Sequence, residues 1–381
     1  VTTWYGGILE IGRFTFENGI VTWIIFGLFY YISAILYAYF IAPKLRLNNI
    51  SSIPSYFNKY YGNNSRIISA IIMLFISSPA PYIIILSTII THIYNISFNY
   101  AVIISTLTSI IYIYIGGYRS IIRTDKLQFI FMFGGFIMML YYLVNNYGGI
   151  HFLLHNVPKK NLSITGNLPI GYILSWFLIS FVTLIDPSIF QRAYTGNSIK
   201  VVKRGLLISV LFWVIFDFLT ITTGLYAAAI IKTTTINPYL YLSDNILPPM
   251  ARSIFYISII SVVMSTIDSF SFVSAFTIGK DIMYKKSLKN VRIGLITTTI
   301  LSLIIIYNFE QAIDIWYMFG SIAASSILIP FLLILFNRNK ISSYPELCLL
   351  LPIIINIIWI YFEYPLNLDS MYPGILGSGI L

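Results

Sequence analysis

Hydroxyl and carboxylate side chains interrupt a long apolar run at residues 258–281. At helical spacing, one face of this run carries Val262, Ser265, Thr266 and Ser269, with Asp268 on its flank. Hydroxyl, carboxylate and carbonyl oxygens are hard ligands, and a set with little formal charge favours a weakly bound monovalent cation over calcium. Small hydroxylated residues also let membrane helices pack closely, which is the alternative. Asp268 favours a cation site, because a carboxylate near mid-membrane costs about 2.5–3.5 kcal/mol unless something offsets it.

Composition and hydropathy patterning place this run within a polytopic membrane protein. Charged residues make up 9% of the 381-residue chain and hydrophobic residues 58%, which excludes an ordinary soluble domain. A single cysteine excludes an intrachain disulfide and a thiolate metal cluster. Ten membrane spans are predicted, at 20–42, 67–95, 98–117, 127–147, 170–190, 205–231, 253–279, 291–308, 312–336 and 346–362.

The net charge of +10 is explained by topology. If the predicted spans alternate in direction, 18 of the 23 Lys and Arg residues lie on one side of the membrane, which is therefore cytoplasmic. A nucleic-acid partner is not needed to explain the basic charge. The expected partners are instead the lipid bilayer and small ligands. The expected location is the plasma or inner membrane, crossed many times.

Two stretches indicate helices that are broken within the membrane. Gly6-Gly7 is a site where a helix can unwind, and residues 1–19 then form the outer part of a broken helix; an extracellular loop is the alternative. Asp186-Pro187 combines an N-cap with a favoured first helical residue near the end of a predicted span. The two breaks correspond if residues 1–147 and 170–336 are two five-helix repeats of opposite orientation, which is a plan of secondary transporters. Residues 345–381 would add accessory helices to this single domain.

Two further acids are candidates for function. Asp217 lies near the centre of its predicted span and shares a face with Trp213, so it is either a functional acid or a buried structural one. Asp125 precedes Gln128 by three residues, a pattern typical of a helix N-cap. Asp125 and Asp268 together could instead hold a second cation, since two nearby carboxylates in a low dielectric do not both stay charged without one.

Four stretches of the sequence resemble the sodium:solute symporters, which have the leucine-transporter fold. They are TTWYGGILEIGRFTFENGI at 2–20, GGYRSIIRTDKLQ at 116–128, DPSIFQRAYTGNS at 186–198 and VVMSTIDSFSFVSAFTIGKDI at 262–282. The resemblance implies an all-α fold of two inverted repeats and sodium-coupled symport. It also implies that the chain is a fragment lacking both termini.

The resemblance further implies ligands. Sodium would bind Thr3, Val262, Ser265 and Thr266, and a second cation, either sodium or a proton, would bind Asp125, Asp268 and Ser269 together with Ser265. The solute would contact Tyr5, Gly6, Gly7, Phe26, Trp213 and Asp217. Sugar-transporting members carry polar side chains where this sequence has Gly7, Phe26, Phe29 and Ile179, which argues against a sugar.

The function expected from the sequence is sodium-driven uptake of a small organic solute by alternating access. An amino acid or a carboxylate is the default solute, and Trp213 with Asp217 would suit one that bears an amine. The alternative is a sensor or regulatory membrane module of the same fold without net transport. No constellation typical of an enzyme is found in the sequence, and no cofactor other than the coupling ion is expected.

Overall fold

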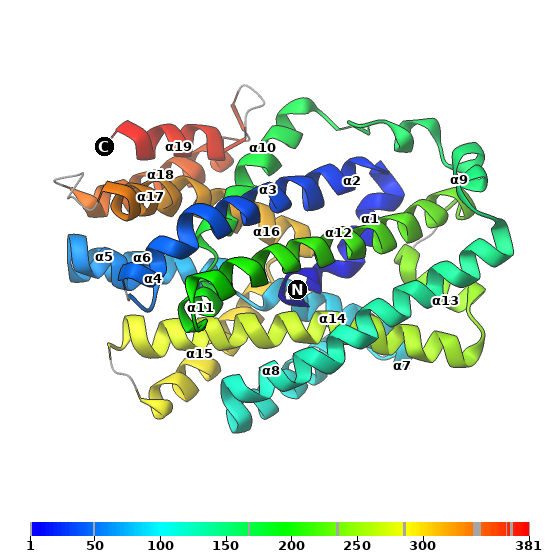
Figure 1. Cartoon of the computed structure of the whole chain (residues 1–381), viewed down its shortest axis with the longest axis horizontal. Helices are drawn as coiled ribbons and strands as arrows, with labels where there is room; N and C mark the ends of the chain where they lie inside the picture. The colour runs from blue at the N-terminus through cyan, green and yellow to red at the C-terminus, as the bar shows by residue number, and fades with distance from the viewer. Residues whose placement is uncertain are drawn as a thin grey trace.

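The chain forms a bundle of helices, described here by a computed structural model (Figure 1). The structure describes residues 2–48, 50–166, 168–233, 236–284, 287–337, 344–362, 364–365 and 369–380. Within these ranges there is no strand, so the predicted all-α class is confirmed. The amino-terminal residues lie in the middle of the bundle, whereas the last three helices lie together at one end of it (Figure 1).

The helices of the first part of the chain follow one another with short connections. In order they are η1 (Thr2–Gly7), α1 (Ile8–Asn18), α2 (Val21–Trp23), η2 (Ile24–Leu28), α3 (Phe29–Leu36), η3 (Tyr37–Ile41), α4 (Ala42–Asn48), α5 (Ile53–Tyr61), α6 (Asn63–Ile76), α7 (Ala80–Tyr94), α8 (Phe98–Tyr147) and α9 (Ile150–Asn156). The elements from α2 to α4 form one continuous apolar helix.

The second part of the chain contains two long helices, α12 and α14. In order its elements are η4 (Lys159–Leu162), α10 (Ile170–Ser180), η5 (Phe181–Ile185), α11 (Pro187–Thr195), α12 (Ile199–Ile230), α13 (Pro238–Ile246), α14 (Pro249–Phe276), η6 (Thr277–Ile282), α15 (Leu288–Ile306), α16 (Ala312–Ala323), η7 (Ala324–Leu328), α17 (Ile329–Asn337), α18 (Pro345–Tyr361) and α19 (Met371–Ile380).

Eight helices in the described part of the chain are long and apolar enough to cross a membrane. They are Val21–Leu47, Asn63–Tyr94, Ile113–Tyr147, Ile170–Thr195, Ile199–Ile230, Pro249–Ile282, Leu288–Ile306 and Ala312–Phe336. The other two predicted spans, at 98–117 and 346–362, correspond to the shorter apolar helices Phe98–Ile111 and Pro345–Tyr361. Both Phe98–Ile111 and Ile113–Tyr147 belong to α8, which is kinked at Gly117, where a φ of 58° and a ψ of −154° are not helical.

Proline interrupts the span from Asn63 to Tyr94. Because Pro79 and Pro81 have no N–H to donate, α6 ends at Ile76 and α7 begins at Ala80. The interruption leaves backbone groups for other partners. The Ser274 hydroxyl of α14 donates to the Ser77 carbonyl oxygen at 2.6 Å, which ties the interruption to α14.

The break predicted at Asp186 is present. Asp186 has an extended backbone, with φ of −64° and ψ of 119°, between the short helix η5 and α11. At Gly6-Gly7 the change is smaller, because the 3₁₀ helix η1 runs directly into α1. Residues 2–18 are therefore helical and lie inside the bundle, and their interpretation as an extracellular loop is wrong (Figure 1).

Two adjacent glycines let η1 approach its neighbours closely. A Cβ atom on Gly6 would lie 2.6 Å from the Cβ of Thr266 on α14. One on Gly7 would lie 2.1 Å from the nearest ring carbon of Trp316 on α16. Real side chains do not tolerate such distances, so only glycine permits this packing. The glycines thus bring the amino-terminal backbone against the hydroxyl-rich stretch of α14.

Candidate functional site

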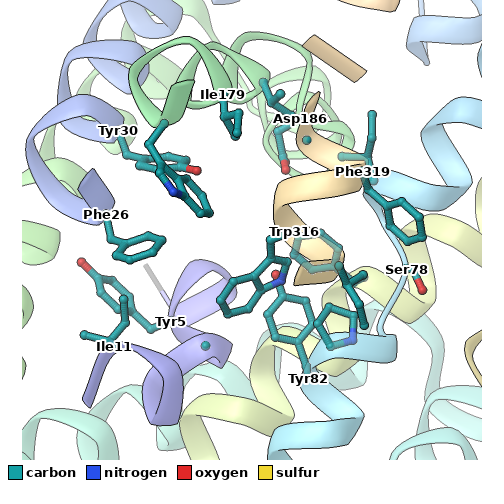
Figure 2. A pocket seen from close by; sticks show the side chains of 18 of the residues that line it. Tyr5, Ile11, Phe26, Tyr30, Ser78, Tyr82, Ile179, Asp186, Trp316 and Phe319 are labelled. Carbon is teal, nitrogen blue, oxygen red and sulfur yellow. The ribbon is translucent and has the colours of Figure 1, made fainter. Parts of the chain in front are cut away.

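A cavity of about 150 Å³ lies at the centre of the bundle, beside η1 (Figure 2). Figure 2 shows Tyr5 and Phe26 on one side of it and Trp316 and Tyr82 on the other, with the Trp316 ring directed toward Tyr5 and Phe26. Its lining residues come from most of the core helices: Tyr5, Gly7, Ile11, Phe26, Tyr30, Tyr31, Phe75, Ile76, Ser78, Pro81, Tyr82, Trp176, Ile179, Val182, Asp186, Trp213, Asp217, Phe270, Ile315, Trp316, Phe319 and Gly320.

Most of the residues predicted to contact the solute lie on this cavity. Five of the six line it: Tyr5, Gly7, Phe26, Trp213 and Asp217. The sixth, Gly6, faces Thr266 and Tyr82 instead. Of the positions that argue against a sugar, Ile179 also lines the cavity, whereas Phe29 packs its ring against Phe177 at 5.1 Å.

Hydrogen bonds hold the acidic wall of the cavity in place. Asp217 on α12 is only 3% exposed, and its Oδ2 accepts a hydrogen bond from the Tyr31 hydroxyl of α3. The Tyr5 hydroxyl donates to the Trp213 carbonyl oxygen at 3.0 Å. These contacts join η1, α3 and α12, so a carboxylate predicted near mid-span is fixed at the cavity wall beside tyrosine hydroxyls.

Aromatic rings form much of the remaining wall, and most of them were not predicted from the sequence. The rings of Phe26 and Trp176 lie 4.8 Å apart between centroids, and those of Tyr82 and Trp316 lie 5.7 Å apart. Spacing along a helix does not distinguish such residues from ordinary packing residues, because aromatic side chains are common throughout this chain. Of the aromatic residues that line the cavity, only Tyr5, Phe26 and Trp213 were singled out from the sequence.

Asp186 combines a structural contact with a place in the cavity wall. Its Oδ1 accepts hydrogen bonds from the Ile189 amide at 2.7 Å and from the Ser188 hydroxyl at 2.6 Å. The predicted cap of the helix that follows, α11, is thereby confirmed. Its position in the cavity wall was not predicted, because a capping signal specifies the contacts of Asp186 with its own helix and not those with other helices.

The predicted sodium ligands on α14 lie directly against η1. Val262, Ser265 and Thr266 are completely buried. The Thr266 hydroxyl donates to the Val262 carbonyl oxygen at 3.2 Å, so the two oxygens are adjacent, and Gly6 packs on the same threonine. Thr3, the predicted ligand from the first helix, lies in η1 with its side chain outside the described residues. The donor set is neutral and rich in oxygen, which fits a weakly held monovalent cation.

The interpretation of Asp125 as a helix N-cap is wrong. Because the chain leaves helical geometry at Gly117, Asp125 lies well inside the helix that follows. Its Oδ1 accepts a hydrogen bond from the Ser265 hydroxyl at 2.5 Å, which links α8 to α14. Its Oδ2 lies 3.9 Å from Nη2 of Arg192 on α11. The spacing to Gln128 that resembled a capping box occurs within a continuous helix.

The second predicted cation region contains a buried carboxylate without a protein partner. Asp268 is completely buried, and neither of its carboxylate oxygens has a hydrogen-bond partner among the residues that the structure describes. One residue away, the Ser269 hydroxyl accepts a hydrogen bond from Nη2 of Arg192 at 3.1 Å. Arg123 and Lys126, the basic residues nearest to Asp125 in the sequence, are exposed. The sequence did not identify Arg192, because its two partners lie on other helices.

Comparison with known proteins identifies the family. Residues 11–342, most of the chain, match the sodium:solute symporter family. The chain belongs to this family. It is therefore a sodium-coupled secondary transporter that crosses the membrane many times, with sodium as the coupling ion. No protein of curated function matches its sequence.

Two solved structures resemble the fold of this symporter. One is a Na⁺-coupled sialic acid symporter, solved with substrate in an outward-open state that reveals a novel Na⁺ site; the TM-score is 0.74 at 18% identity, over 100% of this chain and 88% of the other. The second is Mhp1, a nucleobase-cation-symport-1 family transporter in a closed conformation with bromovinylhydantoin bound; the TM-score is 0.62 at 12% identity, over 100% of this chain and 89% of the other. At these identities the likeness shows the fold alone.

Proposed function

We propose that this symporter uses the inward sodium gradient to take up a small organic solute by alternating access across the plasma or inner membrane of the cell. The observation that carries the proposal is the arrangement of two adjacent glycines. Gly6 packs on Thr266 of the oxygen-rich stretch of α14, and Gly7 lines the central cavity. An ion held between α14 and η1 would therefore fix the same backbone that forms the cavity wall, which supplies a coupling free energy between ion and solute.

The main sodium site in this proposal lies between η1 and α14. Its ligands are the Val262 carbonyl and the hydroxyls of Ser265 and Thr266, completed by Thr3 and other oxygens of η1. Support comes from the adjacency of the Val262 and Thr266 oxygens and from their complete burial. The Ser265 hydroxyl donates a hydrogen bond to Asp125, so the lone pairs of its oxygen remain available to a cation.

A second cation, sodium or a proton, is proposed at Asp125, Asp268 and Ser269. A buried carboxylate without a hydrogen-bond donor is costly, and a bound cation would offset that cost. Asp268 has no such donor among the described residues, whereas Asp125 has Ser265 and Arg192. The region therefore supplies one carboxylate that is partly neutralised by the protein and one that needs a cation.

The solute is proposed to bind in the central cavity. The residues that would contact it are Tyr5, Gly7, Phe26, Trp213 and Asp217. Gly6 would contribute by holding the backbone next to Gly7 against Thr266. A volume of about 150 Å³ is well below the 300–1,000 Å³ typical of sites for drug-sized ligands, which supports a small solute. In this proposal the chain is a single domain of two inverted repeats, residues 1–147 and 170–336, which move relative to one another around the bound solute. Residues 345–381 form accessory helices.

Uptake into vesicles tests the proposal. The purified protein is reconstituted and solute uptake is compared under sodium and potassium gradients, in the parent and in the double variant Ser265→Ala/Thr266→Ala. The double variant should need a higher sodium concentration for half-maximal uptake, since two oxygens of the ion site are lost. The matched control is Ser253→Ala, which removes an exposed hydroxyl from the same helix. Sodium dependence that is the same in the parent and the double variant would refute the assignment of these two ligands.

A further inference from the structure

The ionisable residues on the cavity wall are all acidic. Among the described residues that line it, Asp186 and Asp217 are the only carboxylates, and no Lys, Arg or His is present. Both carboxylates are almost completely buried, with 2% and 3% of their surface exposed. The site therefore has no basic side chain to pair with a carboxylate, phosphate or sulfate on a solute.

Arg192, a basic residue on the helix that Asp186 caps, is directed away from the cavity. Arg192 donates to the Ser269 hydroxyl and to the Ser188 carbonyl, and it approaches Asp125, but it does not line the cavity. An anionic solute in the cavity would thus face two buried carboxylates with no basic lining residue. Like charges in a low dielectric repel strongly, so this arrangement discriminates against solutes with an acidic group.

Aromatic rings supply half of the 22 lining residues, namely Tyr5, Phe26, Tyr30, Tyr31, Phe75, Tyr82, Trp176, Trp213, Phe270, Trp316 and Phe319. The negative faces of aromatic rings attract organic cations, and sites that recognise alkylated ammonium groups are often cages of such rings. Rings also bury alkyl groups favourably. A carboxylate within an aromatic cavity is therefore suited to a cation whose charge is surrounded by carbon.

We propose that the solute of this symporter is a small organic monocation, an alkylated ammonium compound without an acidic group, whose charge is balanced by Asp217 within the aromatic cavity. Asp217 is chosen over Asp186 because Oδ1 of Asp186 is already occupied in capping α11. Asp217 instead has its Oδ2 held by the Tyr31 hydroxyl at the wall of the cavity. The inference rests on the proposed function and narrows its solute. It replaces the amino acid or carboxylate expected from the sequence.

Matched ligands of nearly equal shape test the charge preference. The probes are choline, its uncharged tert-butyl analogue and the zwitterion trimethylglycine, with tetramethylammonium as a smaller cation. Binding to the purified full chain is measured by calorimetry and by the ligand-induced shift in melting temperature, in sodium and in potassium. Choline or tetramethylammonium should bind at least about tenfold more tightly than the uncharged analogue, and trimethylglycine more weakly than choline. Equal binding of the charged and uncharged analogues, tighter binding of the zwitterion, or no binding of either cation overturns the proposal.

Variants separate a charge effect from a structural one. Asp217→Asn should reduce affinity for the cation about tenfold or more while leaving that for the uncharged analogue unchanged, because the amide retains the shape. Phe26→Leu, which removes a ring but keeps an apolar side chain, provides a second test and should also weaken cation binding selectively. Asp314→Asn is the control, since it removes an exposed acid from α16. An unchanged ratio of charged to uncharged binding in both cavity variants overturns the assignment.

The same measurements distinguish this inference from the proposed function. Cation-selective binding that is equal in sodium and potassium, without sodium-driven uptake, would leave the solute class standing and refute the coupling. Sodium-driven uptake of a neutral or acidic solute, without cation preference in binding, would leave the coupling standing and refute the solute class. If both hold, uptake should carry inward current, because sodium and the solute are both positively charged.

Discussion

Replacing Gly6 by alanine should weaken sodium binding through steric conflict alone. The added Cβ would lie 2.5 Å from Cδ1 of Tyr82, 2.6 Å from the Cβ of Thr266 and 2.8 Å from its Oγ1. Thr266 is completely buried on α14, so neither partner can move without shifting a helix or a wall of the cavity. Overpacking of this kind costs typically about 1–3 kcal/mol. If the cost falls mainly on the sodium-bound arrangement, sodium affinity should drop roughly 5–150-fold.

The assay is sodium-dependent solute uptake into vesicles, with the concentration of sodium for half-maximal uptake as the readout. Gly205→Ala on α12 is the matched control, because a Cβ there would have nothing within 4 Å. It should leave the sodium dependence unchanged. Melting temperatures of both variants report whether the cost falls on folding instead. A Gly6→Ala protein that folds normally and keeps the sodium dependence of the parent would refute the reasoning that η1 and α14 form the ion site together.

Further substitutions test the proposed solute site and the proposed second cation site. Gly7→Ala should raise the solute KM at saturating sodium, because its Cβ would lie 2.1 Å from a ring carbon of Trp316 in the cavity wall, and an unchanged KM would place the solute elsewhere. Asp268→Asn and Asp125→Asn should alter the sodium-to-solute ratio or the pH profile of uptake. If both variants fold and keep the ratio and the pH profile of the parent, no second cation binds there.

Local sequence signals predicted most of the helices and the interruption at Asp186, and local chemistry also explains the one at the prolines. Asp186-Pro187 and the pair Pro79 and Pro81 act through backbone chemistry that is the same in any fold: a carboxylate caps free N–H groups, and proline lacks one. The structure accordingly breaks at both places. The apolar runs similarly predicted an all-α membrane protein, because a spanning helix must satisfy its own backbone hydrogen bonds.

Contacts between distant segments were the part that the sequence could not supply. The sequence around Asp125 fits a capping pattern, but the helix that contains Asp125 begins upstream, after Gly117. The carboxylate instead accepts a hydrogen bond from Ser265, 140 residues away. Arg192 gave no local signal either, since its partners are Asp125 on α8 and Ser269 on α14. The resemblance to the symporters supplied candidate ligands, but which ring or charge faces the cavity depends on helix packing, which no single helix specifies.

Asp217 and Asp268 show why burial alone does not assign a role. Both are acids within long apolar helices, and from the sequence each carries the same cost. In the structure Asp217 accepts a hydrogen bond from Tyr31 and lines the central cavity, where an organic ligand can reach it. Asp268 has no donor among the described residues and lies next to a serine that Arg192 contacts. An acid with a donor and a cavity fits a solute site, whereas an acid with neither needs an ion small enough to reach it, so we expect mutation of the two to affect solute selectivity and ion coupling respectively.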